Sequence, residues 1–292
     1  MSDTNQNWSW AKYRDDEHEV RVPPGIDPSK PSVARVYDFV LGGKDNFAAD
    51  RELGEAILKT VPEAPAMARA SRMFLRRAVT YLAREAGIRQ FLDIGSGLPT
   101  QGNVHEIAHE VDPTARVVYV DNDPIVLAHG RALLADNNTT TVIQADLRDP
   151  EAVLNHPGVR EFINFDEPLG LLFMAILHHL NDDEDPGGIA ARFREVLAPG
   201  SHLVISHFCN PGERNPAAAQ IAVDSERLFA ERLGTGRFRT PEEIAAFFGD
   251  MELIEPGLVS PLEWRMDPEE AALLLPPNDI YNNILAGVGR KN

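Results

Sequence analysis

The sequence predicts an α/β protein built on a doubly wound, mostly parallel β-sheet. From about residue 90, short apolar runs alternate with stretches of helical periodicity, which is the pattern of parallel strands joined by right-handed crossovers. The run GLLFMAIL (170–177) is apolar at every position, as expected of a central strand covered on both faces. Helical patterns alone precede residue 90, so we expect an N-terminal helical extension.

The first part of the chain divides into an arm and this extension. Residues 1–31 lack hydrophobic periodicity and contain VPPGIDPSKP, so we expect a flexible arm. Residues 32–89 form the extension, with helical patterns at 46–59 and 66–86. Its first helix, which Gly42-Gly43 ends, has one apolar face made of Val33, Val36, Tyr37, Val40 and Leu41.

The remaining residues, 90–292, are expected to form the sheet domain. Strands are predicted at 90–94, 116–120, 141–144, 170–176 and 202–206, and helices between them at 100–110, 124–134, 151–164 and 187–197. A further helix is predicted at 217–233. Thr240, Pro241 and Glu243 then begin another helix with a capping box. Weaker strand patterns follow at 251–254, 258–261 and 281–286.

Composition and charge narrow the functional classes. The single cysteine, Cys209, cannot form an internal disulfide, and the polar N-terminus lacks the apolar core of a signal peptide. No apolar run approaches the roughly 18–20 residues of a membrane span. The 45 acidic and 28 basic side chains give a net charge of −17, which repels nucleic acids and anionic membranes. We therefore expect a cytoplasmic protein without nucleic-acid or membrane partners. The oligomeric state stays open.

Three predicted strands in succession are followed or ended by a carboxylate. Asp93 ends the first strand ahead of the loop Gly95-Ser96-Gly97, Asp121 follows the second strand, and Asp146 follows the third. In an open α/β sheet, ligands bind beyond the carboxyl ends of the strands. Like charges gathered there destabilise one another unless a cationic or hydrogen-bond-donating ligand offsets them.

These carboxylates select among cofactors. Asp93 would repel the two phosphates of a dinucleotide, and Thr100 occupies the position of the third glycine in a dinucleotide fingerprint. S-adenosylmethionine has no phosphate, and it offers an ammonium, a sulfonium, ribose hydroxyls and an adenine amino group. The glycines let the backbone approach such a ligand closely. The alternative is that Asp121 and Asp146 cap the helices that follow them.

Five stretches of the sequence, one of which contains the loop Gly95-Ser96-Gly97, carry a family resemblance. They are SVARVYDFVLGGKDNFAADR (32–51), FLDIGSGLPTQGNVHEIA (91–108), VVYVDNDPIVLAHGRALL (117–134), ADLRDP (145–150) and LLFMAILHHLND (171–182). In these the chain resembles the Rossmann-like S-adenosylmethionine-dependent methyltransferases. Within that class it looks like a bacterial family first catalogued as a domain of unknown function and later relabelled S-adenosyl methyltransferase.

The resemblance implies a seven-stranded sheet, S-adenosyl-L-methionine as cofactor, and roles for several residues. Asp93, Gly95, Ser96 and Gly97 would bind the methionine part of the cofactor. Asp121 would bind the ribose with Asn122 beside it, and Asp146 and Leu147 would flank the adenine. The resemblance names no acceptor.

Histidines after the fourth and fifth strands are the candidates for acid–base chemistry. His178 is the candidate catalytic residue, should the acceptor have to lose a proton, and His179 and His207 are further candidates at the same edge of the sheet. A structural histidine bonded to a loop carbonyl is the alternative for each. The segment HHLNDDED has the composition of a metal site. However, adjacent histidines at a strand end are expected to point to opposite sides, so no metal is predicted.

The segment ARVYDFVLGGKDNF is predicted to fold over the strand ends as a lid. Its candidate lid or substrate residues are Arg35, Tyr37, Asp38 and Asn46. Its Gly-Gly-Lys run is not a P-loop, because no strand precedes it and no Ser or Thr follows Lys44. An ordinary helical hairpin packed on the sheet is the alternative.

The sequence thus favours a methyltransferase that acts on an unidentified small-molecule acceptor. Trp264, Tyr281 and Phe208 are candidates to line the acceptor pocket, with a core position as the alternative for each. A protein that binds the cofactor or S-adenosylhomocysteine without catalysis is a second interpretation. A nicotinamide-dependent oxidoreductase is disfavoured by positions 93 and 100. A nucleic-acid methyltransferase is disfavoured by the charge and by ILHHL, which stands where an N-P-P-Y-type motif would be.

Overall fold

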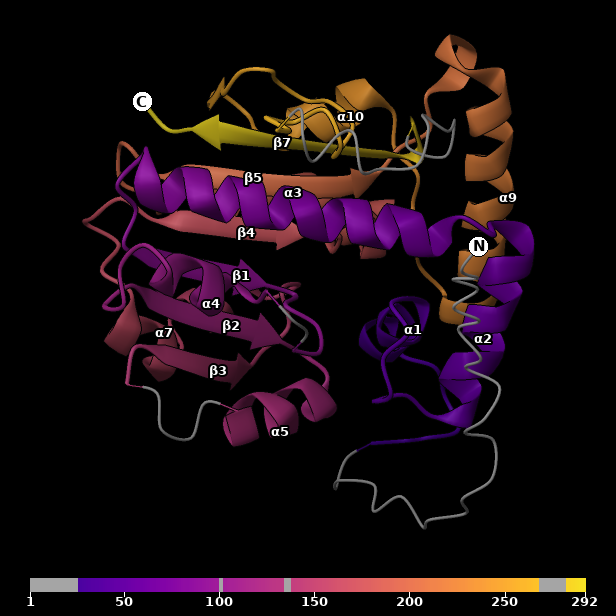
Figure 1. The fold of residues 1–292 in the computed structure, drawn as a ribbon, viewed down its shortest axis with the longest axis horizontal. Coiled ribbons are helices and arrows are strands. Elements are labelled where there is room, and N and C mark those ends of the chain that lie inside the picture. The colour runs from indigo at the N-terminus through magenta and orange to yellow at the C-terminus, as the bar shows by residue number, and fades with distance from the viewer. Residues whose placement is uncertain (1–25, 100–101, 134–137, 268–281) are drawn as a thin grey trace, which may run out of the picture.

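A computed structural model describes residues 26–99, 102–133, 138–267 and 282–292. Within these ranges seven strands form one sheet, in the order β3-β2-β1-β4-β5-β7-β6 (Figure 1). The pairs among the first five strands are parallel, whereas β7 is antiparallel to both β5 and β6. The strands are β1 Gln90–Ile94, β2 Arg116–Asp121, β3 Thr140–Gln144, β4 Gly170–Met174, β5 His202–Phe208, β6 Glu252–Leu253 and β7 Ile284–Arg290. The predicted seven-stranded, mostly parallel α/β sheet is confirmed.

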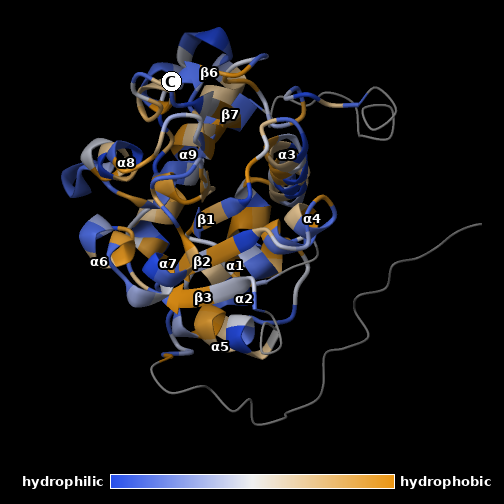
Figure 2. Cartoon of the chain, turned by 90° about the vertical axis from the view of Figure 1, so that its left-hand side faces the viewer, coloured by the Kyte–Doolittle hydropathy of each residue, from blue (hydrophilic) through white to orange (hydrophobic). Residues whose placement is uncertain are grey.

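Helices cover both faces of this sheet. They are α1 Val33–Val40, α2 Ala48–Thr60, α3 Ala64–Arg84, α4 Val104–His109, α5 Pro124–Leu133, α6 Pro150–Leu154, α7 Pro157–Phe162, α8 Pro186–Glu195, α9 Pro216–Leu233 and α10 Pro241–Ala246. Figure 2 shows the strands between α3 and α4 on one side and α6, α7 and α8 on the other. None of the helices in the described part of the chain has both the length and the apolar character needed to cross a bilayer.

Because successive side chains of a strand point to opposite sides, the two faces of the sheet pack into two separate cores. Phe91 packs with Phe74 and Leu82 of α3, while the next residue, Leu92, packs in the core that contains Phe193 of α8. Burying each such side chain contributes about 1.5–3 kcal/mol. The helix α3 shares its core with β4, β5 and β7, so it packs directly on one face of the sheet. The predicted domain boundary at residue 89 stays a prediction.

Several element boundaries differ from the sequence prediction. The helix expected at 151–164 is two helices, because Pro157 has no N–H to continue α6 and instead begins α7 with His156 as its N-cap. The helix expected from residue 100 begins only at Val104, after Asn103 in a capping box. The strand expected at 258–261 is reduced to a single bridge between Val259 and Ala286.

The helices α1, α2 and α9 stand beyond the carboxyl ends of the parallel strands (Figure 1). Ser32 is the N-cap of α1, and its hydroxyl accepts a hydrogen bond from the Arg35 backbone N–H. Gly42, with φ of 85°, follows the helix in a left-handed conformation that favours glycine. The predicted arm at 1–31 falls mostly outside the described residues.

Candidate functional site

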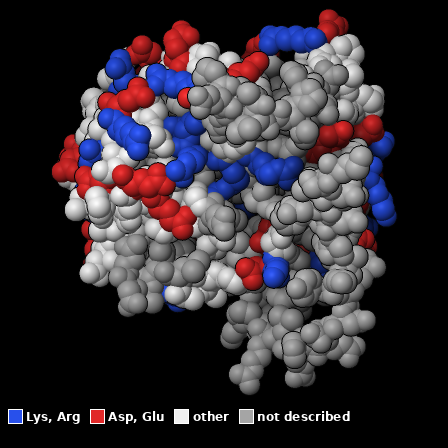
Figure 3. Space-filling model, in the orientation of Figure 1, with Lys and Arg blue, Asp and Glu red and all other residues white. Residues whose placement is uncertain are grey.

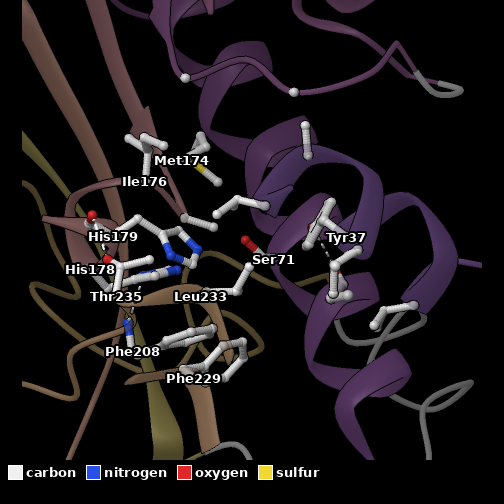
Figure 4. Close-up of a pocket in the computed structure, with 18 of the residues that line it drawn as sticks. Tyr37, Ser71, Met174, Ile176, His178, His179, Phe208, Phe229, Leu233 and Thr235 are labelled. Atoms are coloured by element: carbon white, nitrogen blue, oxygen red, sulfur yellow. Dashed lines mark hydrogen bonds between the residues drawn. The ribbon is translucent and has the colours of Figure 1, made fainter. Parts of the chain in front are cut away.

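A cavity of about 280 Å³ lies between the strand ends and these helices. Its walls come from the loop after β1, the segments after β2, β3, β4 and β5, and helices α1, α3 and α9, with Ile57 of α2. In Figure 4, His178 and His179 lie on one side of the cavity, Tyr37 on the other, and Ser71 between them. This is where the rule for open α/β sheets places a ligand.

The loop after β1 is held tightly by the end of β2. The backbone N–H groups of Gly95 and Ser96 both donate to the Val120 carbonyl, at 2.7 and 3.1 Å. Gly95 has a φ of 69°, and a Cβ there would overlap the side chain of Ile176. Gly97 has a φ of 67° and lines the cavity. Both glycines are therefore required by backbone conformation, and at Gly95 also by packing.

Asp93 is a buried carboxylate at the cavity wall. Its side chain is 6% exposed, and its Oδ1 has no hydrogen-bond partner within the described residues. Burial raises the pKa of Asp93 to about 7; the Arg72 guanidinium opposes this shift and Asp121 adds to it. A buried acceptor atom without a partner is costly in a folded protein. A ligand that brings a cation or a hydrogen-bond donor would relieve that cost.

Asp121 is fixed beside the same loop. Its two oxygens accept hydrogen bonds from the backbone N–H of Gly97 at 2.8 Å and of Asp123 at 2.9 Å. The N–H of Ile125 at the start of α5 goes instead to the Asp123 side chain. Asp121 therefore does not cap α5, and it lines the cavity together with Asn122. Its carboxylate retains lone pairs for hydroxyl donors.

The third predicted carboxylate lies outside the cavity wall. Asp146 accepts hydrogen bonds from the backbone N–H and the guanidinium of Arg148 and from the Asn122 amide. The N-cap of α6 is Asp149, so the capping alternative fails for Asp146 as well. Leu147 and Arg148 line the cavity, and Arg148 also pairs with Glu184. The predicted contact of Asp146 with adenine stays a prediction.

The strand-end histidines differ in their surroundings. The ring Nδ1 of His207 donates to the Phe208 carbonyl at 2.6 Å, and its Nε2 accepts from Arg239 at 3.1 Å, so this histidine is structural. His178 and His179 both line the cavity from a short 3-10 helix, Leu177–His179. Their ring centroids are 4.5 Å apart, because the chain has left the extended conformation. The expectation that they point to opposite sides is wrong.

No metal site accompanies these histidines in the described ranges, where no group of three His, Cys, Asp or Glu side chains could hold an ion. Both rings are neutral at physiological pH. Burial lowers the pKa of His179 to about 3, with a further contribution from Arg148. Burial, and then the neighbouring His179, hold the pKa of His178 well below its ordinary value.

Of the four predicted lid residues, only Tyr37 lines the cavity, and its hydroxyl donates to the Ala68 carbonyl at 3.3 Å. Arg35 is buried, with its guanidinium 2.8 Å from Asp50 and 3.4 Å from Asp123. Asp38 accepts hydrogen bonds from the Asp45 backbone and the Asn46 amide. Arg35 therefore ties the N-terminal segment to the end of β2, whereas Asp38 and Asn46 hold the turn after α1 together.

Sequence reasoning missed several cavity residues. Arg72 of α3 lines the cavity beside Asp93. No sequence signal marks it, because it lies in a helix before the first strand and belongs to none of the strand-end motifs. Ser225 of α9 and Asn283 before β7 were also missed. Among the predicted aromatic lining residues, Phe208 lines the cavity. Trp264 is buried in the core, where its ring centroid lies 5.4 Å from that of Phe74. Tyr281 lies outside the described residues.

The net charge does not describe every face of the molecule. Figure 3 shows Lys and Arg side chains gathered across the middle of one face, over the region of α3. Arg76 there pairs with Glu110, and Arg265 pairs with Glu85. The absence of a nucleic-acid partner therefore stays a prediction, because the overall charge of −17 does not extend evenly over this face.

Comparisons with known proteins agree with this geometry. The model of the S-adenosyl methyltransferase family matches residues 19–292. A structure described as a "putative methyltransferase" from Thermobifida fusca YX is 48% identical, covers 93% of this chain and 99% of that chain, and superposes with a TM-score of 0.84. A DUF574 family protein from Streptomyces avermitilis MA-4680 is 41% identical over 91% of this chain and 99% of that one, with a TM-score of 0.84.

A more distant structure shares the fold alone. An O-methyltransferase family protein from Burkholderia thailandensis is 14% identical, with a TM-score of 0.50 over 78% of this chain and 60% of that chain. No curated protein matches the chain. The family match spans nearly the whole sequence and includes the seven described strands and the cavity residues. The resemblance inferred from the sequence motifs is confirmed: the chain belongs to the S-adenosyl methyltransferase family.

Proposed function

We propose that this protein binds S-adenosylmethionine at the glycine loop and transfers its methyl group to a small molecule held in the same cavity. The single observation that supports this best is Asp93, a buried carboxylate with an unpartnered oxygen at the cavity wall. An ammonium would offset both its charge and its missing hydrogen bond. A dinucleotide phosphate at this place would add repulsion to an already unfavourable carboxylate.

The other cavity residues near the glycine loop suit the other parts of S-adenosylmethionine. Gly97 has open space where a Cβ would stand, so its backbone is accessible to the nucleoside, and Asp121 offers lone pairs to the two ribose hydroxyls. Leu147 presents an apolar side chain of the kind that packs against an adenine ring. When bound, the cofactor supplies a methyl carbon activated by the adjacent positive sulfur.

The protein's own contribution is to orient the acceptor and exclude water. Holding two reactants in line can supply much of the rate of a displacement reaction without any acid or base. The helix α1 lines the cavity with Val33, Val36, Tyr37 and Val40, and Arg35 secures it to the segment after β2. We propose that this segment is a lid over the site, which moves when ligands enter and leave.

Calorimetric titration of the purified full chain tests the cofactor half of this proposal. We expect S-adenosylmethionine and S-adenosylhomocysteine to bind, and NAD⁺ to bind at least about 100-fold more weakly because of the carboxylate. Asp93→Asn removes the charge with little change in shape and should weaken both sulfur nucleosides by about 10- to 100-fold. The control is Asp183→Asn, at an exposed carboxylate outside the cavity, which should leave both affinities unchanged.

Tight binding of NAD⁺ with no binding of either sulfur nucleoside would overturn the proposal. Binding of the nucleosides without methyl transfer to any acceptor would favour the second interpretation, a protein that binds the cofactor without catalysis. Turnover is measured as S-adenosylhomocysteine release in the presence of fractions of a small-metabolite extract.

A further inference from the structure

The part of the cavity formed by the helices has no charged side chain within the described residues, except Arg72 beside Asp93. The cavity residues from α1, α2 and α9 are all uncharged, and so are Thr235, Phe238 and Asn283. The other charged lining residues, Asp93, Asp121, Asp123 and Arg148, belong to the strand ends. A charged group of an acceptor would therefore lose its hydration among the helices without gaining a counter-charge from α1, α2 or α9.

Stacked aromatic rings form one wall of this helical end. The ring of Phe208 lies parallel to that of His178, with centroids 3.6 Å apart and an interplanar angle of 13°. Phe238 stacks on Phe208 at 4.7 Å and 14°, and Phe229 of α9 lies 5.7 Å from Phe208. Figure 4 shows Phe208 and Phe229 close to the two histidines. His178 and Phe238 cover the two faces of Phe208, so these rings form a packed aromatic wall of the cavity, which favours contact with an apolar, aromatic ligand.

His178 has a defined tautomer because of one backbone contact. Its Nδ1 accepts a hydrogen bond from the Phe208 backbone N–H at 3.2 Å. Since a backbone N–H can only donate, Nδ1 is unprotonated, and the proton of the neutral ring is on Nε2. In the described part of the chain, this is the one hydrogen bond of the His178 side chain. The ring lines the cavity, so Nε2 is left as a hydrogen-bond donor for a ligand.

Other polar atoms around the same space also lack partners within the described residues. Ser225 Oγ, His179 Nδ1 and Asn283 Oδ1 are buried, unpaired and on cavity-lining residues. Asn283 has a fixed orientation, because its amide donates to the carbonyls of Cys209 and Ala218. Buried polar atoms are seldom left unpaired in a native protein. A few polar atoms that converge in an apolar chamber are the usual features of a small-molecule site.

We propose that the acceptor is an uncharged aromatic molecule, oriented by a hydrogen bond that His178 Nε2–H donates to one of its oxygen or nitrogen atoms. This inference rests on the proposed function, since it concerns the second ligand of the same cavity. His178 then acts as a hydrogen-bond donor to the acceptor. It does not act as the proton acceptor that its position after β4 suggested, because its cavity-facing nitrogen already carries a proton.

Three bicyclic probes of similar shape separate the elements of this proposal. Quinoline has a ring nitrogen that accepts a hydrogen bond, naphthalene has none, and 2-naphthoate has a negative charge. Their affinities are measured calorimetrically with the full chain saturated with S-adenosylhomocysteine, whose own titration tests the proposed function independently. We expect quinoline to bind about tenfold tighter than naphthalene, and naphthalene at least about tenfold tighter than 2-naphthoate.

Variants of His178 test the donor role. His178→Leu should weaken quinoline by about tenfold and leave naphthalene unchanged, so that the two probes become equal. His178→Gln places an amide N–H near the position of Nε2 and should restore most of the lost quinoline affinity, although it cannot take up a proton. The control is His202→Leu, which changes an equally buried histidine outside the cavity and should preserve the difference between the probes.

Each contrary result has its own meaning. If 2-naphthoate binds as tightly as the neutral probes, or if no probe binds while S-adenosylhomocysteine does, the proposed acceptor class is wrong and the cofactor assignment stands. If His178→Leu leaves quinoline tighter than naphthalene, the donor role is wrong. If S-adenosylhomocysteine itself does not bind, the proposed function fails, and this inference fails with it.

Discussion

The two ends of the cavity differ in kind. At the strand ends, Asp93 and Asp121 bring carboxylates to a loop of backbone N–H groups, and Arg72 lies beside them. At the helical end, the walls are apolar and aromatic, and both histidines are neutral. Strand ends present polar backbone and short acidic side chains, whereas amphipathic helices present their apolar faces. One cavity can therefore hold a charged and a neutral ligand side by side.

The buried ion pairs of Arg35, which connect α1 to the strand ends, should show the largest effect of a single substitution. Arg35→Met removes the guanidinium that links α1 to Asp123 at the strand ends and to Asp50, which is fully buried. Breaking a buried ion pair on one side leaves an uncompensated charge and costs about 3–5 kcal/mol. We expect a loss of that size in the free energy of unfolding, measured by urea denaturation, together with weaker binding of S-adenosylhomocysteine.

The matched control is Arg232→Met. Arg232 of α9 pairs with Glu52 of α2, but its side chain is 44% exposed and that of Glu52 is 75% exposed. Such a surface pair contributes about 0.5 kcal/mol or less. Similar losses in the free energy of unfolding for the two variants would show that Arg35 does not hold α1 to the strand ends.

The charged end should show an intermediate effect that depends on pH. The pKa of Asp93 is about 7 in the folded protein against an ordinary value of 3.8, so between these values the folded state binds the extra proton. Stability therefore falls as pH rises through this window, and the whole cost is present above pH 7. Asp93→Asn should raise the Tm of the ligand-free protein by about 5 °C at pH 8 and by only about 1–2 °C at pH 5.

Differential scanning calorimetry at the two pH values checks this prediction. Asp183→Asn, the exposed control, should shift Tm by less than about 1 °C at both. A Tm gain for Asp93→Asn that is the same at pH 5 and pH 8 would mean that Asp93 titrates normally. Combined with the expected loss of nucleoside affinity, a gain at pH 8 would identify a residue whose charge serves binding at the expense of stability.

The neutral end should show the smallest effect. Tyr37→Phe removes a hydroxyl whose one hydrogen bond, to the Ala68 carbonyl, is long at 3.3 Å, and keeps the apolar ring on the cavity wall. We expect the free energy of unfolding to fall by about 1 kcal/mol or less. The affinity for S-adenosylhomocysteine should stay unchanged in calorimetry. A tenfold loss of that affinity would place Tyr37 in the cofactor site and contradict the division of the cavity.

Much of the strand end was predictable because its signals are local. The runs at 90–94 and 116–120 were correctly placed as strands, and Asp93, Gly95, Gly97 and Asp121 follow from where those strands end. Helix boundaries differ from the prediction where proline or a capping residue begins a helix. The helix α7 begins at Pro157 because His156 is its N-cap, and α4 begins at Val104 because Asn103 is its N-cap.

The sequence by itself determined the fold class, the family and the carboxylate-lined loop, because alternating periodicity and strand-end residues act over a few positions. Only the tertiary structure decided which side chains of neighbouring residues reach the cavity. Tyr37 faces it while Arg35 is turned to Asp50 and Asp123, and His178 lines it while His207 is held by Arg239. The physical reason is that burial and hydrogen-bond partners come from segments far away in sequence, which only packing brings together.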